Sequence, residues 1–185
     1  MDITTRVTSG TAKNRKLKIP DIEGIRVHKD VFKQALFNII GEKIVNANCL
    51  DLFAGSGSAG IEALSRGAKH CDFVDHNKRA ITTIQENLST CGLQDLAQIF
   101  HSDCIKYIAN IYKKYNVIFC DPFYSDLKHK FLLKNLAEIL EKGGLIAFSH
   151  SKDLNLEEQL IGTSLKILQS RKYGESFLSI IGFGK

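Results

Sequence analysis

The amino-acid sequence predicts one α/β domain over residues 1–185, in which helices alternate with the strands of a parallel, doubly wound sheet. Short apolar runs alternate with longer amphipathic stretches from about residue 30 to residue 148, and this order gives right-handed crossovers between parallel strands. Two more strand-like runs, 165–172 and 176–183, are separated by only three residues, too few for a helix. We therefore expect them to form an antiparallel hairpin that completes the sheet.

Each element follows from hydrophobic periodicity and from residues that start or stop helices. Apolar residues three and four positions apart predict helices at 31–40, 58–66, 77–90, 103–112 and 127–140. Asp30, Asn77 and Asp103 are placed as N-caps, and Gly67 and Gly92 as terminators. Apolar runs predict parallel strands at 49–53, 71–75, 97–100, 117–120 and 145–148. Residues 6–19 are expected to form a small β-hairpin that turns near Lys13 and Asn14.

Composition and patterning exclude several classes of protein. The hydrophobic fraction of 44% and the charged fraction of 24% are ordinary for a globular protein. No stretch approaches the roughly 18 apolar residues of a membrane span, and the first residues lack the apolar segment of a signal peptide. The five cysteines are dispersed and the six histidines lack metal-ligand spacing, so we expect reduced core thiols and no metal site. A cytoplasmic, monomeric protein is the expectation.

Positive charge is concentrated near the N-terminus. Residues 1–33 carry eight Lys and Arg but four Asp and Glu, a balance of +4 within a net charge of +5 for the chain. Such a basic segment favours contact with a nucleic-acid backbone, although charge alone leaves a solvated surface ribbon equally open. Residues 1–30 are therefore expected to be a nucleic-acid-binding extension. Its candidate contacts are Arg6, Arg15, Lys16, Lys18, Arg26 and Lys29.

A glycine-rich turn lies between the first strand of the predicted sheet and the helix that follows it. Gly55, Gly57 and Gly60 fit the pattern GxGxxG, in which glycine permits a positive φ and leaves room for a ligand beside the helix amides. Dinucleotide-dependent enzymes and S-adenosylmethionine-dependent methyltransferases both use such a turn, and in both an acidic residue like Asp75 ends the next strand and binds ribose hydroxyls. Asp51 discriminates between the two classes, because a carboxylate inside the strand suits a cationic amino-acid ligand better than a pyrophosphate.

Four more residues complete the expected cofactor site. Asp103 lies just beyond the third strand, where its carboxylate can accept a hydrogen bond from an adenine amino group while the backbone amide of Cys104 donates to the ring. Asp103 can also be the N-cap of the next helix, since a cap uses one carboxylate oxygen. Phe53, at the end of the first strand, and His76, which can cover the ligand beside the ribose-binding carboxylate, are the other two.

The tetrapeptide Asp121-Pro122-Phe123-Tyr124 follows the fourth strand of the predicted sheet. That strand is expected to lie next to the first, at the topological switch point where α/β sheets place their sites. A carboxylate and the Pro122 carbonyl can accept the two N–H bonds of an exocyclic base nitrogen, while an aromatic ring stacks on the extruded base. Asp121, Pro122 and Tyr124 are therefore the candidate catalytic residues. For the tetrapeptide alone, a strand end with a turn-forming proline is the alternative.

Several stretches of the chain together resemble one known family. They are the basic segment around Arg15 and Lys16, residues 50–57, residues 60–68 with the sequence GIEALSRGA, and the tetrapeptide. In these stretches the chain resembles the bacterial methyltransferases of the RsmD type, which make N2-methylguanine in 16S ribosomal RNA. The resemblance implies a Rossmann-like class I methyltransferase fold with S-adenosylmethionine as cofactor. It also implies cofactor contacts at Asp51, Gly55, Gly57, Asp75 and Asp103, and catalytic roles for Asp121, Pro122 and Tyr124. It also implies that the substrate is ribosomal RNA or the assembling small ribosomal subunit.

The chain departs from the family pattern in two places. Phe123 stands where the family usually has a second proline, which removes a fixed φ from the loop, and Val27-His28-Lys29 replaces the usual Pro-Thr-Thr. A DNA methyltransferase acting on adenine N6 or cytosine N4, and a non-catalytic RNA-binding module on the same fold, therefore stay open. Asp51 and the lack of a separate substrate domain argue against a dehydrogenase. The expected function is methylation of the exocyclic N2 of a guanine in 16S ribosomal RNA, without a metal or a membrane.

Overall fold

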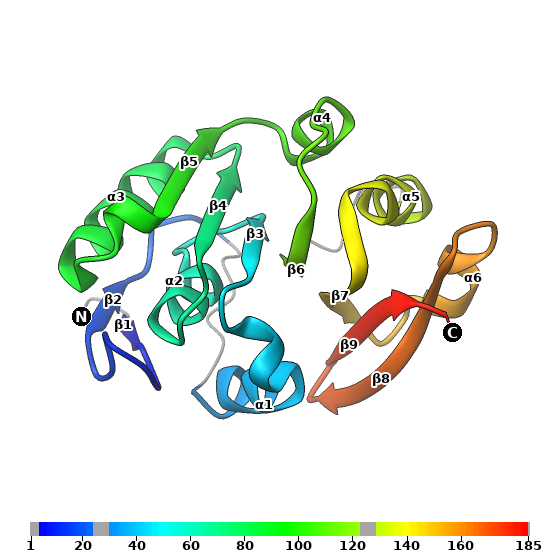
Figure 1. The fold of residues 1–185 in the computed structure, drawn as a ribbon, viewed down its shortest axis with the longest axis horizontal. Helices are drawn as coiled ribbons and strands as arrows, with labels where there is room; N and C mark the ends of the chain where they lie inside the picture. The colour runs from blue at the N-terminus through cyan, green and yellow to red at the C-terminus, as the bar shows by residue number, and fades with distance from the viewer. Residues whose placement is uncertain (1–3, 24–29, 123–128, 185) are drawn as a thin grey trace.

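The computed structural model describes residues 4–23, 30–122 and 129–184, and in this part of the chain seven strands form one sheet in the order β5-β4-β3-β6-β7-β9-β8 (Figure 1). The strands are β3 (Asn48–Leu52), β4 (His70–Asp75), β5 (Ala97–His101), β6 (Tyr115–Cys120), β7 (Leu140–Ser151), β8 (Leu165–Tyr173) and β9 (Ser176–Phe183). Strands β3 to β7 pair in parallel, and β9 pairs antiparallel with both β7 and β8. The predicted parallel sheet and its C-terminal antiparallel hairpin are therefore confirmed.

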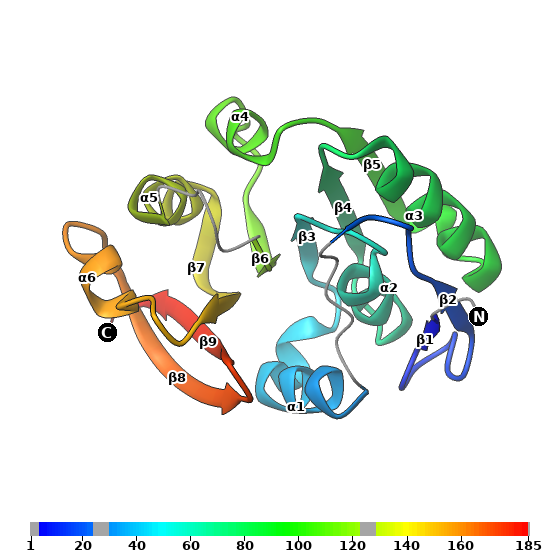
Figure 2. The same cartoon turned by 180° about the vertical axis from the view of Figure 1, so that it is seen from behind.

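Helices cover both faces of this sheet (Figures 1 and 2). On one side lie α1 (Asp30–Ile40), α2 (Ser58–Ser65), α3 (Lys78–Cys91) and a separate hairpin of β1 (Thr4–Arg6) and β2 (Lys16–Lys18). On the other side lie α4 (Cys104–Ala109), α5 (His129–Ile139) and α6 (Leu156–Leu160), and short 3₁₀ turns follow α1 (Gly41–Ile44) and α3 (Gln94–Leu96). Because successive strand residues face opposite sides, Cys49 packs into the first core and Leu50 into the second.

The capping residues behave as the sequence predicts, with one exception. The side chain of Asn77 accepts from the Arg79 N–H at 2.9 Å, and Gly92 ends α3 with a φ of 67°. Asp30 is instead the first residue of α1, and its carboxylate accepts from Nε of Arg6 at 2.7 Å. This contact ties the start of α1 to strand β1.

The predicted N-terminal hairpin is present, but it packs against the domain as part of its core. Its two strands have only three residues each. Val7 and Leu17 have no exposed surface and belong to the core on the side of α2 and α3. Gly10 approaches α2 so closely that a Cβ at this position would stand 1.7 Å from the carbonyl oxygen of Ser65. The hairpin is thus held in one place relative to the sheet.

Strand β7 is longer than the predicted strand at 145–148. It begins at Leu140, which already pairs with Tyr115, and a register shift separates this pair from the one between Leu145 and Val117. The strand therefore passes through an irregular segment in which Gly143 has a φ of 77°. The pair Gly143-Gly144 lies inside the strand and does not precede it.

Other boundaries differ as well, and helix α6 has no counterpart among the predicted elements. Helix α4 ends at Ala109, three residues before the predicted end, and Tyr112, the predicted last residue, is 99% exposed. Phe53 does not belong to strand β3, since its φ of 62° makes it part of the turn. The unpredicted helix is α6, where the side chain of Asn155 accepts from the N–H of Glu158 at 3.3 Å.

Replacing Gly60 with alanine is expected to destabilise the fold by about 1–3 kcal/mol through overpacking. A Cβ at this position would lie 2.4 Å from Cε1 of Phe73 and 2.7 Å from Sγ of Cys71, inside the core between α2 and β4. Chemical denaturation measures the loss. Gly184→Ala is the matched control, because a Cβ there would meet only the far end of the flexible Lys166 side chain, with Cε at 2.7 Å. Equal stability of the two variants would contradict this account of α2 packing.

Candidate functional site at the carboxyl edge of the sheet

A cavity of about 320 Å³ opens at the carboxyl ends of β3, β4 and β6. The predicted site residues that line it are Asp51, Phe53, Gly55, Asp75, His76 and Asp121. Residues of α1 and of the N-terminal segment form another wall, which includes Lys33 and Thr5. The fold therefore brings the glycine turn and the start of the tetrapeptide, which are some seventy positions apart in the chain, to one cavity.

Asp51 is the most unusual ionisable group of this cavity. Its side chain comes from the end of β3 and the residue is only 4% exposed. Its Oδ2 accepts from the backbone N–H of Gly60 at 2.8 Å. Burial raises the pKa of Asp51 to about 8, the Gly60 hydrogen bond opposes this rise, and the nearby carboxylates of Asp75 and Asp121 add to it. A buried carboxylate that is surrounded by like charges is a natural partner for a cationic ligand group.

The glycine turn follows Asp51 with three residues of positive φ. These are Phe53 at 62°, Gly55 at 55° and Gly57 at 73°. The side chain of Asn87 in α3, which is buried, donates to the Ser56 carbonyl oxygen at 2.9 Å and so holds the turn from outside. The turn is therefore a fixed cradle in which backbone faces the cavity at Gly55.

Asp75 fixes the turn from the neighbouring strand. Its Oδ2 accepts from the Gly55 N–H at 2.9 Å, and its Oδ1 accepts from the Asn77 N–H at 2.8 Å. Each oxygen of a carboxylate has a second acceptor site, so Asp75 can still accept from ligand hydroxyl groups. His76 next to it has a side chain that is 63% exposed at the rim of the cavity.

Four of the predicted cofactor contacts lie outside the described lining of the cavity. Gly57 is the N-cap of α2, and Gly60 packs against Phe73. Asp103 is exposed and caps α4 by accepting from the Lys106 N–H at 2.8 Å, while Cys104 is buried behind it. The contact of these four residues with a cofactor stays a prediction.

Only the first half of the tetrapeptide can be placed. Asp121 directly follows β6 and lines the cavity, and Pro122 beside it is buried. Phe123 and Tyr124 lie outside the described residues. The pairing of β6 with β3 is what brings Asp121 within electrostatic reach of Asp51.

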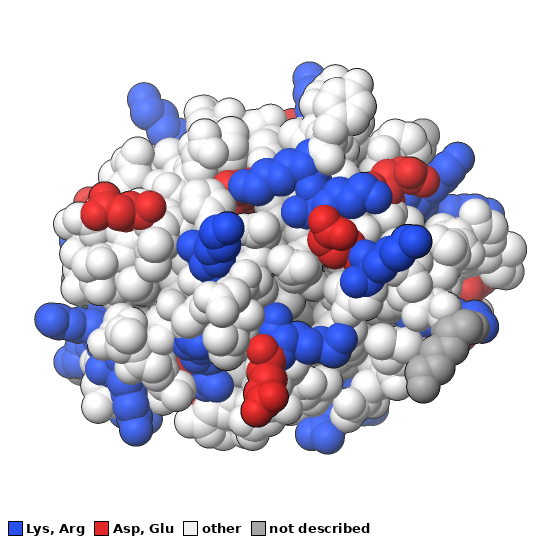
Figure 3. Space-filling view, viewed as in Figure 1, with Lys and Arg blue, Asp and Glu red and all other residues white. Residues whose placement is uncertain are grey.

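The basic candidates of the N-terminal segment divide into two groups. Arg15 and Lys16 are exposed. Arg6 and Lys18 are exposed as well, but they form ion pairs with Asp30 and Glu86, each at 2.7 Å. Arg26 and Lys29 lie outside the described residues. Figure 3 shows Lys and Arg side chains spread over one face of the molecule, with Asp and Glu among them. RNA contact by these residues stays a prediction.

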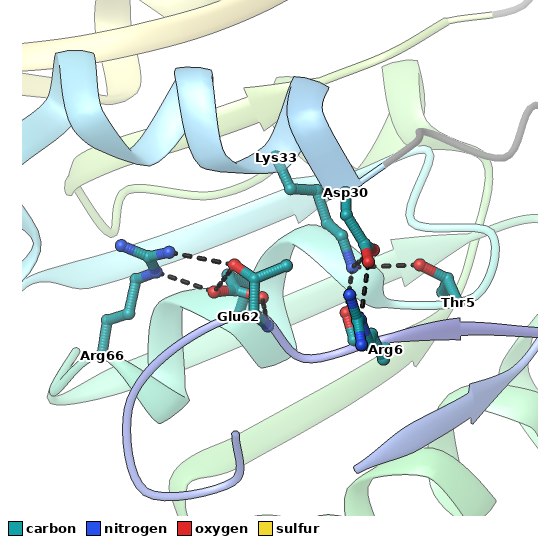
Figure 4. Close-up of polar contacts among 7 residues, drawn as sticks. Thr5, Arg6, Asp30, Lys33, Glu62 and Arg66 are labelled. Atoms are coloured by element: carbon teal, nitrogen blue, oxygen red, sulfur yellow. Dashed lines mark hydrogen bonds and ion pairs between the residues drawn. The ribbon is translucent and has the colours of Figure 1, made fainter. Parts of the chain in front are cut away.

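The sequence prediction missed two polar networks that position the wall of the cavity (Figure 4). Lys33 of α1 is only 2% exposed, and its Nζ donates to Oγ1 of Thr5 at 3.0 Å. Glu62 of α2 has no exposed surface and accepts from Arg66 Nε and from the Thr8 N–H, both at 2.7 Å. The signal for Glu62 and Arg66 is their spacing of four on one helix, but the contacts with the hairpin join distant positions.

In the part of the chain that the structure describes, no three or more His, Cys, Asp or Glu side chains are grouped as a metal site would need. None of its helices is both long enough and apolar enough to cross a membrane.

The chain is similar to ribosomal RNA methyltransferases in sequence. It is 38% identical over 180 residues to the "Putative rRNA methyltransferase YlbH" of Bacillus subtilis, with 95% of this chain and 97% of the relative covered. It is 33% identical over 142 residues to the ribosomal RNA small subunit methyltransferase D of Escherichia coli, with 77% of this chain and 69% of the relative covered.

Solved structures and a family model agree with this similarity. The "Putative methyltransferase yhhF" of Escherichia coli superposes with a TM-score of 0.87 at 25% identity, with 98% of each chain covered. SMU.776, "a putative methyltransferase complexed with SAH", shares the fold with a TM-score of 0.74 at 17% identity, over 90% of this chain and 53% of the other. A family model described as Conserved hypothetical protein 95 matches residues 5–182, and the chain therefore belongs to that family.

Proposed function

We propose that the protein is an S-adenosylmethionine-dependent methyltransferase that acts on the exocyclic N2 of a guanine in 16S ribosomal RNA. The observation that supports the proposal is the shared cavity, where buried Asp51, the glycine turn held by Asp75 and Asp121 meet. The names of the two curated relatives support RNA as the substrate class. The proposal includes a cytoplasmic monomer that needs no metal.

The residues of the cavity fit this cofactor. Asp51 is a buried carboxylate whose raised pKa would fall again beside the ammonium group of the cofactor's amino-acid end. Asp75, anchored on both oxygens by backbone N–H groups, can accept from ribose hydroxyls. Ile22 and Phe53 provide apolar surface for the adenine ring. A neighbour in fold, SMU.776, was solved with SAH.

The chemistry follows from the position of the tetrapeptide. When bound, S-adenosylmethionine supplies a methyl group on a positively charged sulfur. The Asp121 carboxylate and the Pro122 carbonyl would accept the two N–H bonds of the base amino group and direct its lone pair at that methyl group. The N–C bond would form as the S–C bond breaks, and the nitrogen would lose one of its two protons. Tyr124 stacks on the flipped base and keeps it in line. Catalysis then depends on positioning and on exclusion of water more than on a strong base.

The relatives and the site disfavour two of the three alternatives. A DNA methyltransferase is disfavoured because both curated relatives are named for ribosomal RNA. A dehydrogenase is disfavoured by Asp51, since a pyrophosphate would face a buried carboxylate. The third alternative, a binding module without catalytic turnover, can be tested only by measuring methyl transfer.

The test is methyl transfer to RNA from cells that lack the protein. Small subunits and naked 16S RNA from such cells are incubated with the protein and S-adenosylmethionine, and mass spectrometry of the digested RNA reports N2-methylguanine. The proposal predicts one new methylated guanine with at least one of the two substrates. Binding of cofactor and RNA without methyl transfer to RNA or DNA would identify a binding module instead.

Substitutions at the tetrapeptide separate its two roles. Asp121→Ala is expected to abolish methyl transfer with nearly unchanged affinity for S-adenosylhomocysteine, because Asp121 touches the acceptor nitrogen. Tyr124→Ala is expected to raise the activation free energy of methyl transfer by about 1–3 kcal/mol through lost stacking, and Tyr124→Phe is expected to raise it much less. Phe123→Pro, the family's usual residue, should preserve or raise the rate.

Single-turnover rates and calorimetric affinities measure these effects. Asp95→Ala, which removes an exposed carboxylate on the 3₁₀ turn after α3, is the matched control and should leave both unchanged. Methylation by Asp121→Ala at the unmutated rate would show that the proposed catalytic site is wrong.

Replacing Arg15 and Lys16 together by alanine is expected to weaken RNA binding and to reduce its dependence on salt, because two phosphate contacts are lost. Affinity for S-adenosylhomocysteine should not change, since both side chains are exposed outside the cavity. Lys134→Ala with Lys142→Ala removes two other exposed charges and is the control. If the salt dependence of RNA binding is unchanged in the Arg15 and Lys16 double variant, these two side chains are solvated surface residues that do not contact RNA.

A further inference from the structure

Lys33 places a buried positive charge in the wall of the cavity. The residue is 2% exposed, yet it lines the cavity together with Thr5. Its Nζ donates to Oγ1 of Thr5 at 3.0 Å and to the carbonyl oxygen of Arg6 (Figure 4). Both acceptors are neutral, so these hydrogen bonds orient the ammonium group without neutralising it.

The nearest carboxylate does not fully compensate this charge. Oδ1 of Asp30 lies 4.0 Å from Nζ of Lys33, which is beyond hydrogen-bond distance, and Oδ2 of Asp30 is bound to Arg6 at 2.7 Å. Among the described residues, one of the three N–H groups of Lys33 thus has no acceptor within hydrogen-bond distance. Burial lowers the pKa of Lys33, and Glu62 and Asp30 oppose this effect. A buried ammonium group in this situation gains from a negatively charged ligand.

Asp51, in the same cavity, is a buried group of opposite charge type. Among the described residues, its carboxylate accepts a hydrogen bond from the Gly60 N–H. Lys33 and Asp51 line the same cavity. Asp51 accepts from the amide of Gly60 in the first turn of α2, and Glu62, two residues further along this helix, is the carboxylate whose charge acts most strongly on Lys33. Ser58 and Ala59, at the start of α2, line the cavity with them. One buried acid and one buried base on a single cavity match the two charges of an α-amino acid.

We propose that Lys33 binds the carboxylate at the amino-acid end of the cofactor, while Asp51 binds its ammonium group. The inference rests on the proposed function, because it assumes that the cavity binds S-adenosylmethionine. It adds a residue of α1 to the cofactor site. It also links the cofactor to strand β1. The Lys33 ammonium group that would bind the cofactor carboxylate is the same group that donates to Thr5 and to the carbonyl oxygen of Arg6.

A purely structural role is the competing account of Lys33. In that case the side chain only holds β1 against α1, and its loss would disturb every ligand of the cavity alike. The two accounts are separated by comparing S-adenosylhomocysteine with its decarboxylated analogue, which keeps the adenosine and the ammonium group. Only the ligand-binding account predicts that Lys33 distinguishes the two ligands.

The experiment measures the affinity of both ligands by calorimetry for the unmutated protein and for Lys33→Met, which keeps most of the side-chain length and removes the charge. Removal of the ligand carboxylate should weaken binding to the unmutated protein about tenfold to hundredfold, as loss of a charge-assisted hydrogen bond does. In Lys33→Met this ratio should collapse to within about twofold to threefold. Lys33→Arg should restore most of the discrimination, and Lys43→Met, an exposed lysine bound to the Gly143 carbonyl, should leave it unchanged.

Each outcome supports or overturns the inference. An equal loss of affinity for both ligands in Lys33→Met, or a discrimination ratio equal to that of the unmutated protein, would show that Lys33 is structural and would leave the proposed function intact. If the unmutated protein binds neither ligand, the proposed function and the inference fall together. The affinity of Lys33→Met for the decarboxylated ligand also reports whether the variant is folded.

Discussion

The structure depends on one buried carboxylate, Asp51, held at the end of a strand beneath a helix. It accepts from the Gly60 N–H at 2.8 Å and is 4% exposed, which is an expensive state for an ionised group. The contact requires α2 to lie close to the sheet, and Gly60 permits this because no Cβ stands between the helix and Phe73. Gly60 therefore has two roles: its N–H binds the Asp51 carboxylate, and its lack of a side chain allows α2 to pack against the sheet.

The order of the strands turns this local arrangement into a two-sided site. Strand β3 has β4 on one side and β6 on the other, so the residues at their carboxyl ends meet although they are far apart in the chain. Asp75 from β4 fixes the glycine turn, and Asp121 after β6 faces the same cavity. Asp51 at the centre accordingly senses both of their charges.

Signals confined to one segment could be predicted from the sequence, and contacts between distant segments could not. Parallel strands buried on both faces and the Asn77 cap were predictable because each depends on adjacent residues. Strand β7 starts early through a pairing of Leu140 with Tyr115, which no local pattern reveals. The role of Lys33 depends on contacts with β1, 27 and 28 positions away. The exposed position of Asp103, likewise, depends on where α4 packs.

The measurement that tests this account most directly counts the protons released when S-adenosylhomocysteine binds at pH 6.5. With a pKa of about 8, Asp51 carries a proton there before binding, and the ligand's ammonium group should expel it by favouring the ionised form. Calorimetry in buffers of different ionisation enthalpy is predicted to show release of nearly one proton for the unmutated protein and almost none for Asp51→Asn. Binding without proton release in the unmutated protein, or with equal release in both, would contradict the role of Asp51 as the receptor of the cation.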